Sequence, residues 1–511
     1  MSMNKITQVL IKNFGIILVL LLSFWAVRPL FAPGFFPIHD DTQVARVFEM
    51  GKMLSRGIFP VRWVPDLGYG YGYPIFNFYA PLAYYVGGIL TLVGLDALIA
   101  TKIMVISGVL LSGIFMYLLA KEFWGEIGGI ISGLFYVYAP YHALDIYVRG
   151  DVAEFWAYAF VPLIFYGLYK IYNDYKLYKK SRWKWVVVGA LGYTGVILSH
   201  NLTAMMVTPF LIIVTLLYCY IAYRKRNIHT TYYLILATVL GLILSAFYWV
   251  PALLELKYTN VLSQIGGGAD FRDHFVCIQQ LWSSPWGFGG STKGCVDGMS
   301  FMIGKLHTIG LLIALALVFI TMRNKNYNSY KYYILLAFAG FVISIFLTLG
   351  IAKPIWEAVP LMAFFQYPWR FLILSSFFSS FLAGFAIWFL KKVLRNNHSN
   401  TLVYYSTAII VVFFLLFFNV KLFTPQTILS KTSDDYTNER ALKWTTSKIS
   451  DEFLPPNFKK PKSEYEIAKK PVPFKETAIE KISNAASIVG IIVLIIGIIV
   501  AGKGLIKNNK A

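Results

Sequence analysis

The sequence predicts an all-α integral membrane protein with about twelve transmembrane helices. Of its 511 residues, 57% are hydrophobic and only 14% are charged, whereas soluble domains are nearer to a quarter charged. Uncharged runs of about 15 to 22 residues recur along the chain, the length that a helix needs to cross a hydrocarbon layer of roughly 30 Å. Lys and Arg are concentrated in short clusters between these runs, a pattern typical of polytopic membrane proteins.

The apolar runs predict the individual spans in chain order. The first run follows Lys5 and Lys12 in the manner of a signal peptide, but it lacks a small-residue cleavage site, so we interpret it as a retained helix. The predicted spans lie near 13–31, 101–119, 126–141, 155–172, 186–199, 202–223, 231–253, 306–322, 332–350, 371–390, 402–420 and 485–502.

The net charge of +21 does not indicate a nucleic-acid partner, because the basic residues fall between spans. With these spans the clusters share one side, which the positive-inside rule makes cytoplasmic together with both termini. We therefore expect a cell-membrane protein of the cell envelope, with anionic lipids as its partners. The clusters are Lys176, Lys179, Lys180, Arg182 and Lys184; Arg224, Lys225 and Arg226; Arg323, Lys325 and Lys331; Lys391, Lys392 and Arg395; and Lys503, Lys507 and Lys510.

The large loops are then extracytoplasmic. A full crossing by the apolar segment 76–95 would move the Lys176–Lys184 cluster outside, so we interpret this segment as an interfacial or re-entrant juxtamembrane helix. Cys277 and Cys295 share one loop and can form a disulfide if it faces an oxidising compartment. The predicted outer segments are 32–100, 142–154, 254–305, 351–370 and 421–484.

We divide the chain into three parts. Residues 1–420 form a polytopic transmembrane domain with a large first outer loop at 32–100. Residues 421–484 are too short and too polar for an independent enzyme domain, so we expect a small extracytoplasmic cap or tether. Residues 485–511 form the last transmembrane helix and a basic cytoplasmic tail.

Two adjacent acids, Asp40 and Asp41, follow His39 just after the first span. Acidic side chains at a membrane surface are costly unless they are paired, bind a metal ion or perform chemistry. The alternative is that Asp41 and Thr42 cap a helix whose apolar residues then recur at a helical spacing. Asp40 is not needed for such a cap, so the pair indicates a catalytic or metal-binding role.

The following segment, 56–81, is dense in glycine, proline and aromatic residues. Aromatic faces such as that of Tyr79 can stack on sugar rings, although an interfacial aromatic belt without a ligand explains them equally well. Arg62 is a candidate phosphate ligand, because a guanidinium group matches phosphate oxygens in a bidentate way.

Arg149, Asp151 and Glu154 lie in the second outer loop. They can form an ordinary salt bridge, or, if this loop folds against the first, an acidic pocket that includes Asp40 and Asp41. An acidic pocket of this kind would suit a divalent cation.

Two further motifs face the same side. His200, in Ser199-His200-Asn201, is a candidate substrate ligand or an ordinary interfacial histidine. FQYPWRF at 365–371 supplies candidate ligands for an anionic lipid headgroup, although a snorkelling arginine is the plain alternative. The candidates in this motif are Gln366, Trp369 and Arg370.

The ordered set of motifs resembles one family. The motifs are HDDTQVARVFEMGKMLSRGIFPVRW, GYGYPIFNFYAPLAYY, RGDVAEF, SHNLTA, FQYPWRF and EFLPP. They are similar to those of the membrane proteins called 6-pyruvoyl-tetrahydropterin-synthase-related, over most of the chain. The name implies no pterin chemistry here, because the sequence contains no soluble pterin-enzyme domain. That family in turn resembles the GT-C glycosyltransferases, so a GT-C-like fold is implied.

The resemblance implies inverting transfer of a sugar from a polyprenyl-phosphate donor to a glycan, lipid or protein acceptor. In GT-C enzymes an acidic motif follows the first span, here matched by Asp40-Asp41, and a second acid follows the third span, here matched by Asp151 or Glu154. One carboxylate of Asp40 or Asp41 would act as base. The candidates for the phosphate are Arg62, Arg149 and Arg370.

Metal dependence stays open in this resemblance, because GT-C enzymes occur in both kinds. The leaving phosphate needs positive charge or a divalent metal ion. Asp40, Asp41 and Asp151, with Glu154, can hold Mg²⁺ or Mn²⁺ through oxygen ligands.

Two other classes of protein remain alternatives. A transporter or lipid flippase predicts charged residues in the middle of spans, whereas Glu255 and Glu357 lie at predicted outer edges. A non-catalytic scaffold predicts that replacing Asp40 and Asp41 disturbs only folding. No G-x-x-x-x-G-K-[ST], H-E-x-x-H, G-x-S-x-G or C-x-x-C motif occurs, which disfavours ATP-driven transport, zinc proteolysis and serine hydrolysis.

Overall fold

The computed structural model describes residues 8, 12–178, 183–261, 269–323, 330–394 and 398–508. Over these residues the protein is helical, and β structure is limited to isolated bridges such as Phe35 with Leu429. The protein is an integral membrane protein with multiple apolar spans. Some of the basic residues that were predicted to be cytoplasmic lie outside the described ranges. They are Lys5, Lys179, Lys180, Arg182, Lys325, Arg395 and Lys510.

The chain divides into two compact units, each built from three separate stretches. Unit 1 comprises Met1–His39, Ile106–Gly150 and Gly266–Leu429, and unit 2 comprises Asp40–Val105, Asp151–Ile265 and Ser430–Ala511. The chain passes from one unit to the other directly before Asp40 and directly before Asp151. Asp40 and Asp151, the first acids of the two predicted motifs, are therefore the first residues of unit 2 after these boundaries. The division into 1–420, 421–484 and 485–511 stays a prediction.

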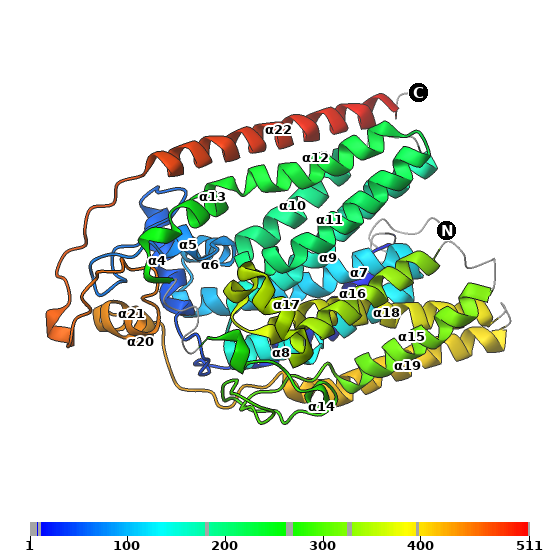
Figure 1. The fold of residues 1–511 in the computed structure, drawn as a ribbon, viewed down its shortest axis with the longest axis horizontal. Coiled ribbons are helices and arrows are strands. Elements are labelled where there is room, and N and C mark those ends of the chain that lie inside the picture. The colour runs from blue at the N-terminus through cyan, green and yellow to red at the C-terminus, as the bar shows by residue number, and fades with distance from the viewer. Residues whose placement is uncertain are drawn as a thin grey trace. The chain divides into compact units, whose positions relative to one another are not determined.

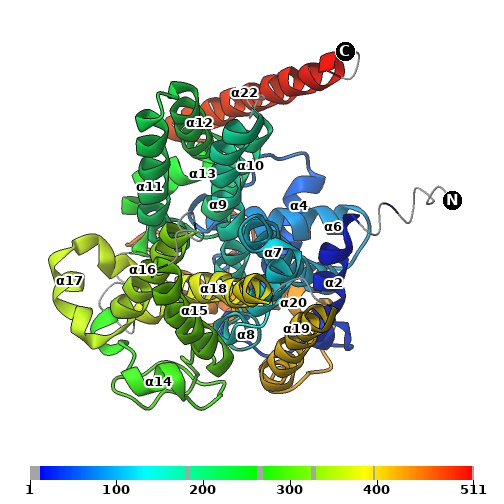
Figure 2. The ribbon, with the colours of Figure 1, turned by 90° about the vertical axis from the view of Figure 1, so that its right-hand side faces the viewer.

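Unit 1 is organised around α18 (Leu372–Val393), which packs with α15, α16 and α19 (Figure 2). The backbone of α18 lies close to that of Gly128, because a Cβ at Gly384 would lie only 2.4 Å from the carbonyl oxygen of Gly128. Small residues permit this close helix approach, which is typical of membrane interiors. The other helices are α2 (Phe14–Leu22), α3 (Phe24–Val27), η1 (Arg28–Phe31), α8 (Pro140–Leu144), the π-helix η2 (Asp145–Arg149), η5 (Phe271–Asp273), α14 (Ile278–Trp282), α15 (Lys305–Arg323), α16 (Lys331–Thr348), η7 (Gly350–Ala352), α17 (Lys353–Ala358), η8 (Pro360–Phe365), η9 (Pro368–Phe371), α19 (His398–Asn419) and η10 (Val420–Leu422).

Unit 2 contains a helical bundle in which α22 (Ala478–Asn508) runs beside α12 and α13 (Figure 1). Helices α9 and α10 approach closely, because a Cβ at Gly167 would lie 2.4 Å from the Cα of Gly189. The other elements are α4 (Gln43–Ser55), α5 (Ile75–Phe78), α6 (Leu82–Leu92), α9 (Val152–Tyr178), α10 (Trp183–Ser199), α11 (Asn201–Arg224), α12 (Ile228–Leu244), α13 (Ala246–Leu254), η3 (Leu256–Tyr258), α20 (Asp434–Thr437), the π-helix η11 (Ala441–Thr446), α21 (Ser447–Ile449) and η12 (Glu464–Glu466).

The predicted count of about twelve spans is not confirmed. Among the described residues, eight helices are long and apolar enough to cross a membrane, or up to nine if α12 and α13, bent by 65°, form one span. The difference has two sources. Helix α7 (Ala97–Val137) is broken at Gly125, where φ is 72°. Gly133 packs against Gly113, so the chain folds back there and α7 contains both predicted spans, 101–119 and 126–141. The predicted span 186–199 corresponds to α10, which has 17 residues. The predicted span 306–322 lies in α15, where the apolar stretch is Lys305–Phe319 and also falls short of 18 residues.

Two loop predictions concern connections between spans. The segment 76–95 contains α6, whose 11 residues cover roughly half of a 30 Å hydrocarbon layer, so it does not form a span of its own. Cys277 and Cys295, left open by the sequence, form a disulfide.

Candidate active site

An acidic cluster with one histidine lies within unit 2. Asp151, Glu154 and His200 each offer one ligand atom, and these atoms lie within 4.8 Å of one another. All three side chains are buried, with exposed fractions of 4%, 0% and 6%. Burying two carboxylates beside an imidazole is costly unless the charges are compensated, which marks the cluster as a candidate functional site.

Helix starts bring the three residues together. Asp151 precedes α9, and its Oδ1 accepts a 3.0 Å hydrogen bond from the backbone N–H of Glu154, the usual arrangement of an N-cap aspartate. His200 precedes α11, and its Nδ1 lies 2.8 Å from Oγ1 of Thr203. The Thr203 contact orients the imidazole ring. The cluster therefore stands where the start of α9 meets the start of α11.

The ligand set of this cluster fits a divalent cation. Carboxylate oxygens suit Mg²⁺ and Mn²⁺, and an imidazole nitrogen shifts the preference toward transition metals, so Mn²⁺ is the best match. Within the ranges that the structure describes, the ligand atoms of these three side chains lie close enough together to hold one ion. Asp40 and Asp41, predicted as metal ligands with Asp151, are not part of it.

Asp40 belongs to the same surroundings as Asp151. Burial raises the pKa of Tyr79 and of Tyr84, and the carboxylates of Asp151 and Asp40 both add to that rise. Asp40 and Asp151 thus both lie near enough to Tyr79 and Tyr84 to influence these phenols.

Asp41 has a different environment. Its Oδ2 lies 4.0 Å from Nζ of Lys431, and both side chains are about one-third exposed. Burial raises the pKa of Asp41, and the positive charge of Lys431 opposes this rise. The alternative interpretation, a helix cap by Asp41 and Thr42, holds only for position: Thr42 is the N-cap residue of α4, but no side-chain hydrogen bond caps this helix.

Arg46 and Gln43 are residues of this site that the sequence reasoning missed. The guanidinium of Arg46 stacks 4.3 Å from the ring centre of Tyr79. That face of Tyr79, predicted to stack on a sugar ring, is therefore covered by an arginine. The signal was present in the sequence: Gln43, Arg46 and Glu49 repeat every three residues along α4, between apolar residues, and all three are buried.

Arg62, a predicted phosphate ligand, lies in another polar network of unit 2. Its Nη1 donates to Oδ1 of Asn77 at 2.8 Å, and its Nη2 donates to Oδ1 of Asn484 at 2.7 Å. Asn77 also donates to Glu255, which accepts a hydrogen bond from Thr477. The Arg62 guanidinium thus joins the first loop to α22, an arrangement that favours a structural role.

Unit 1 brings together the arginines of two separate motifs. The guanidinium of Arg149 lies 4.6 Å from the ring centre of Trp369 and pairs with the carboxylate of Asp145. The guanidinium of Arg370 lies 5.8 Å from the ring of Trp369. Both arginines are 6% exposed. Buried arginines on an aromatic ring form a candidate anion site, although Asp145 already compensates one of the two charges.

The backbone around this arginine cluster is constrained. A Cβ at Gly150 would lie 2.4 Å from Ile38, so only glycine fits beside the first loop, where the backbone N–H of His39 donates to Val148. Nε2 of His39 lies 3.0 Å from the carbonyl oxygen of Phe288. Gln366 has a φ of 64°, a conformation that costs a non-glycine residue about 1 kcal/mol or more and is often found at functional sites.

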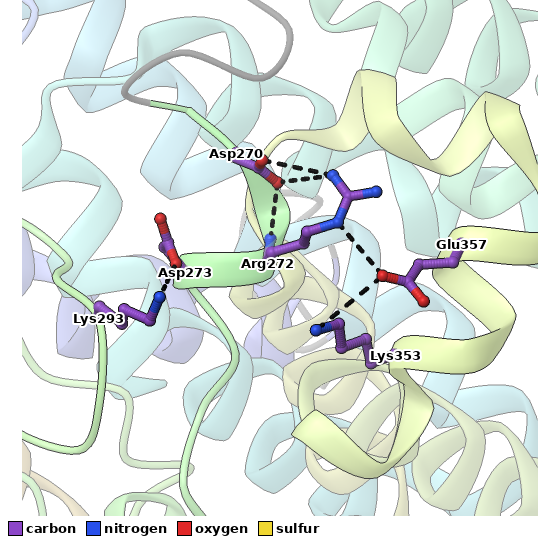
Figure 3. A network of polar contacts seen from close by, with 6 residues as sticks. All are labelled: Asp270, Arg272, Asp273, Lys293, Lys353 and Glu357. Carbon is purple, nitrogen blue, oxygen red and sulfur yellow. Dashed lines mark hydrogen bonds and ion pairs between the residues drawn. The ribbon is translucent and has the colours of Figure 1, made fainter.

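A second polar group in unit 1 lies on the surface. Arg272 bridges Asp270 and Glu357, and Lys293 pairs with Asp273 (Figure 3). The adjoining cavity has a volume of about 640 Å³ and is partly apolar. The cavity lining includes Arg272, Lys293 and Lys353 with Asp273, and each of these cations is paired with a carboxylate of the network. The network is Asp270, Arg272, Asp273, Lys293, Lys353 and Glu357.

Comparison with known proteins identifies a domain and a fold. Residues 76–281 match the model of the 6-pyruvoyl-tetrahydropterin-synthase-related domain, a membrane protein domain. An uncharacterized protein of Lactococcus lactis subsp. cremoris is 24% identical over 251 residues, which cover 47% of this chain and 39% of that protein.

Solved structures of an archaeal and a bacterial protein are similar to this chain. An oligosaccharyltransferase of Archaeoglobus fulgidus, with a tethered acceptor peptide, matches with a TM-score of 0.51 and 12% identity over 94% of this chain and 64% of its own. ArnT of Cupriavidus metallidurans, bound to undecaprenyl phosphate, matches with a TM-score of 0.36 and 12% identity over 87% and 77% of the two chains. The first likeness shows a fold similar to that of GT-C glycosyltransferases. This chain spans less than two thirds of the length of the Lactococcus relative and of the oligosaccharyltransferase.

Proposed function

We propose that this chain, which carries a 6-pyruvoyl-tetrahydropterin-synthase-related membrane domain and has a GT-C-like fold, is a glycosyltransferase that uses a polyprenyl-phosphate sugar donor. The observation that carries the proposal is the buried cluster of Asp151, Glu154 and His200. The carboxylates of Asp151 and Glu154 can bind a cation, and that of Asp40 can act as a base, so together they suit a reaction that needs both functions.

Asp40 is the base in this proposal. Its carboxylate takes the proton from the acceptor hydroxyl while that oxygen attacks the anomeric carbon and the bond from this carbon to the phosphate oxygen breaks. Asp41 is the weaker candidate, because Lys431 lies beside its carboxylate. The backbone carbonyl of Asp40 instead accepts a 3.2 Å hydrogen bond from Nε2 of the buried Gln43.

Asp151, Glu154 and His200 hold a divalent cation in this proposal, with Mn²⁺ favoured over Mg²⁺ by the imidazole ligand. When bound, the cation supplies positive charge to the phosphate leaving group. Thr203 keeps the imidazole oriented through its contact with Nδ1, as partners of metal-binding histidines commonly do.

The arginine cluster of unit 1 is a separate candidate for binding the anionic donor. Arg149 and Arg370 share Trp369 as an aromatic neighbour, and guanidinium groups match phosphate oxygens. The acceptor is a glycan, a lipid or a protein, and transfer takes place on the extracytoplasmic side, because the basic clusters predict that the loops carrying these motifs face outward.

The proposal is tested by measuring sugar release from a panel of polyprenyl-phosphate sugars by the purified protein in lipid nanodiscs. Mn²⁺ binding to the same samples is measured by electron paramagnetic resonance. Wild type is compared with Asp151→Asn, which keeps the shape of the side chain and its oxygen acceptor but removes the charge.

Sugar release by wild type, lost in Asp151→Asn together with high-affinity Mn²⁺ binding, is the expected result. The absence of both sugar release and donor binding across the panel would contradict the proposal and favour a transporter or scaffold. Release that persists in Asp151→Asn would remove this cluster from the reaction.

A further inference from the structure

A segment near the C-terminal end of the chain packs on the acidic loop of unit 2. This segment, Ser430–Leu454, is called the docking segment below. Lys431 lies 4.0 Å from Asp41, and Ser450 accepts a 3.0 Å hydrogen bond from Nη2 of Arg46. Its contacts therefore reach both Asp41, just before α4, and the second turn of α4.

A continuous chain of hydrogen bonds runs from Ser450 toward Asp40. Arg46 donates from Nη2 to Ser450 and from Nη1 to the hydroxyl of Tyr84 at 3.3 Å. The Tyr84 hydroxyl donates to Oε1 of Gln43 at 2.5 Å, and Nε2 of Gln43 donates to the backbone carbonyl oxygen of Asp40 at 3.2 Å.

Every donor between Arg46 and Asp40 points in the same direction. Such chains are mutually reinforcing, because each bond polarises the next in a low-dielectric interior. Gln43, Arg46 and Tyr84 are all buried, so a broken link leaves a buried polar group without its partner. Because of this penalty, replacing any one of these side chains is expected to destabilise the whole chain of hydrogen bonds.

We propose that the docking segment positions Asp40 through the chain Ser450–Arg46–Tyr84–Gln43. This inference deepens the proposed function and rests on it for the role of Asp40. Gln43, Arg46, Tyr84 and Ser450 are positioning residues. The docking segment is thereby a part of the active site that does not itself supply a reacting group.

The first test measures backbone hydrogen exchange by mass spectrometry on the full chain in nanodiscs, so it does not depend on knowing the donor. Ser450→Ala is compared with Ser447→Ala. Ser447 is also buried in the docking segment, but its hydroxyl bonds to Leu442 and to the backbone of Tyr69. Ser450→Ala removes the acceptor of Arg46 together with the Ser450 contacts to Tyr73 and Glu452. It is expected to speed exchange in the peptide covering 38–46 about fivefold, because that peptide contains Arg46.

Ser447→Ala is expected to leave exchange at 38–46 unchanged, and Ser450→Thr, which keeps a hydroxyl, is expected to restore wild-type exchange. Equal exchange at 38–46 in Ser450→Ala and Ser447→Ala would overturn the inference. This measurement stands even if wild type releases no sugar from any donor, an outcome that would contradict the proposed function alone.

The second test is kinetic. Gln43→Leu removes both the acceptor of Tyr84 and the donor to Asp40, and it is expected to lower kcat about three- to tenfold with little change in the KM for the donor. Adding Ser450→Ala to Gln43→Leu is expected to cost less than the product of the two single effects, because both changes break one chain. Unchanged kcat in Gln43→Leu, or fully multiplicative effects in the double variant, would overturn the inference.

Discussion

Asp40 and Asp41 are neighbours in the sequence, and the structure predicts sharply different consequences when each is replaced by asparagine. Asp40→Asn removes the proposed base and is expected to lower kcat by about 100-fold or more, the usual contribution of a positioned general base. Asp41→Asn removes a partly exposed contact with Lys431 at 4.0 Å. Such pairs contribute about 0.2–1 kcal/mol to stability, so Asp41→Asn is expected to lower the unfolding midpoint slightly and to leave kcat close to that of wild type.

The assay is sugar release from a polyprenyl-phosphate sugar by purified protein in nanodiscs, together with the thermal unfolding midpoint of each variant. Lys431→Gln is the matched control, because it removes the same ion pair as Asp41→Asn without touching either aspartate. It is expected to reproduce the small effect of Asp41→Asn. The reasoning would be refuted if Asp41→Asn abolished turnover while Asp40→Asn and Lys431→Gln retained it, since Asp41 would then be the base.

Three other outcomes are expected. Glu154→Gln and His200→Ala should each weaken Mn²⁺ binding at least tenfold in electron paramagnetic resonance titrations; unchanged affinity in both would exclude the cluster as the cation site. Arg149→Gln and Arg370→Gln should raise the KM for the donor about tenfold, the loss of one charge-assisted hydrogen bond, and an unchanged KM in both would separate the cluster from donor binding. Burial, with the Asp66 carboxylate adding to it, raises the pKa of Glu49 from 4.5 to about 8. The folded state therefore holds a proton on Glu49 that the unfolded state releases, and the resulting stabilisation, complete below pH 4.5, is lost as pH rises through about 8. Glu49→Gln should flatten this fall in the unfolding midpoint between about pH 5 and 9. Parallel wild-type and variant profiles would contradict this expectation.

Local patterns in the sequence were sufficient for the membrane-spanning character and for the motifs. The sequence placed Asp151 and Glu154 in the second outer loop, whereas in the structure Glu154 lies in the first turn of α9 and Asp151 caps this helix. The non-crossing interpretation of 76–95 came from charge parity, and the short helix α6 agrees with it. Runs of apolar residues and clusters of basic residues are local information, because the bilayer acts on each span through its own composition.

The span count was less predictable than the spans themselves. The fold-back at Gly125 depends on the close approach of Gly113 and Gly133, and the bend of 65° between α12 and α13 depends on packing. Both features involve residues that are adjacent only after the helices assemble.

By itself, the sequence determined that this is a polytopic helical membrane protein and which polar residues were candidates for chemistry. Only the tertiary structure joined His200 to Asp151 and Glu154, set Lys431 beside Asp41, and assigned Arg62 to Asn77 and Asn484. The physical reason is that a buried polar side chain must find its partner wherever the fold provides one. These partners lie far away along the chain, so no spacing between neighbouring residues records them.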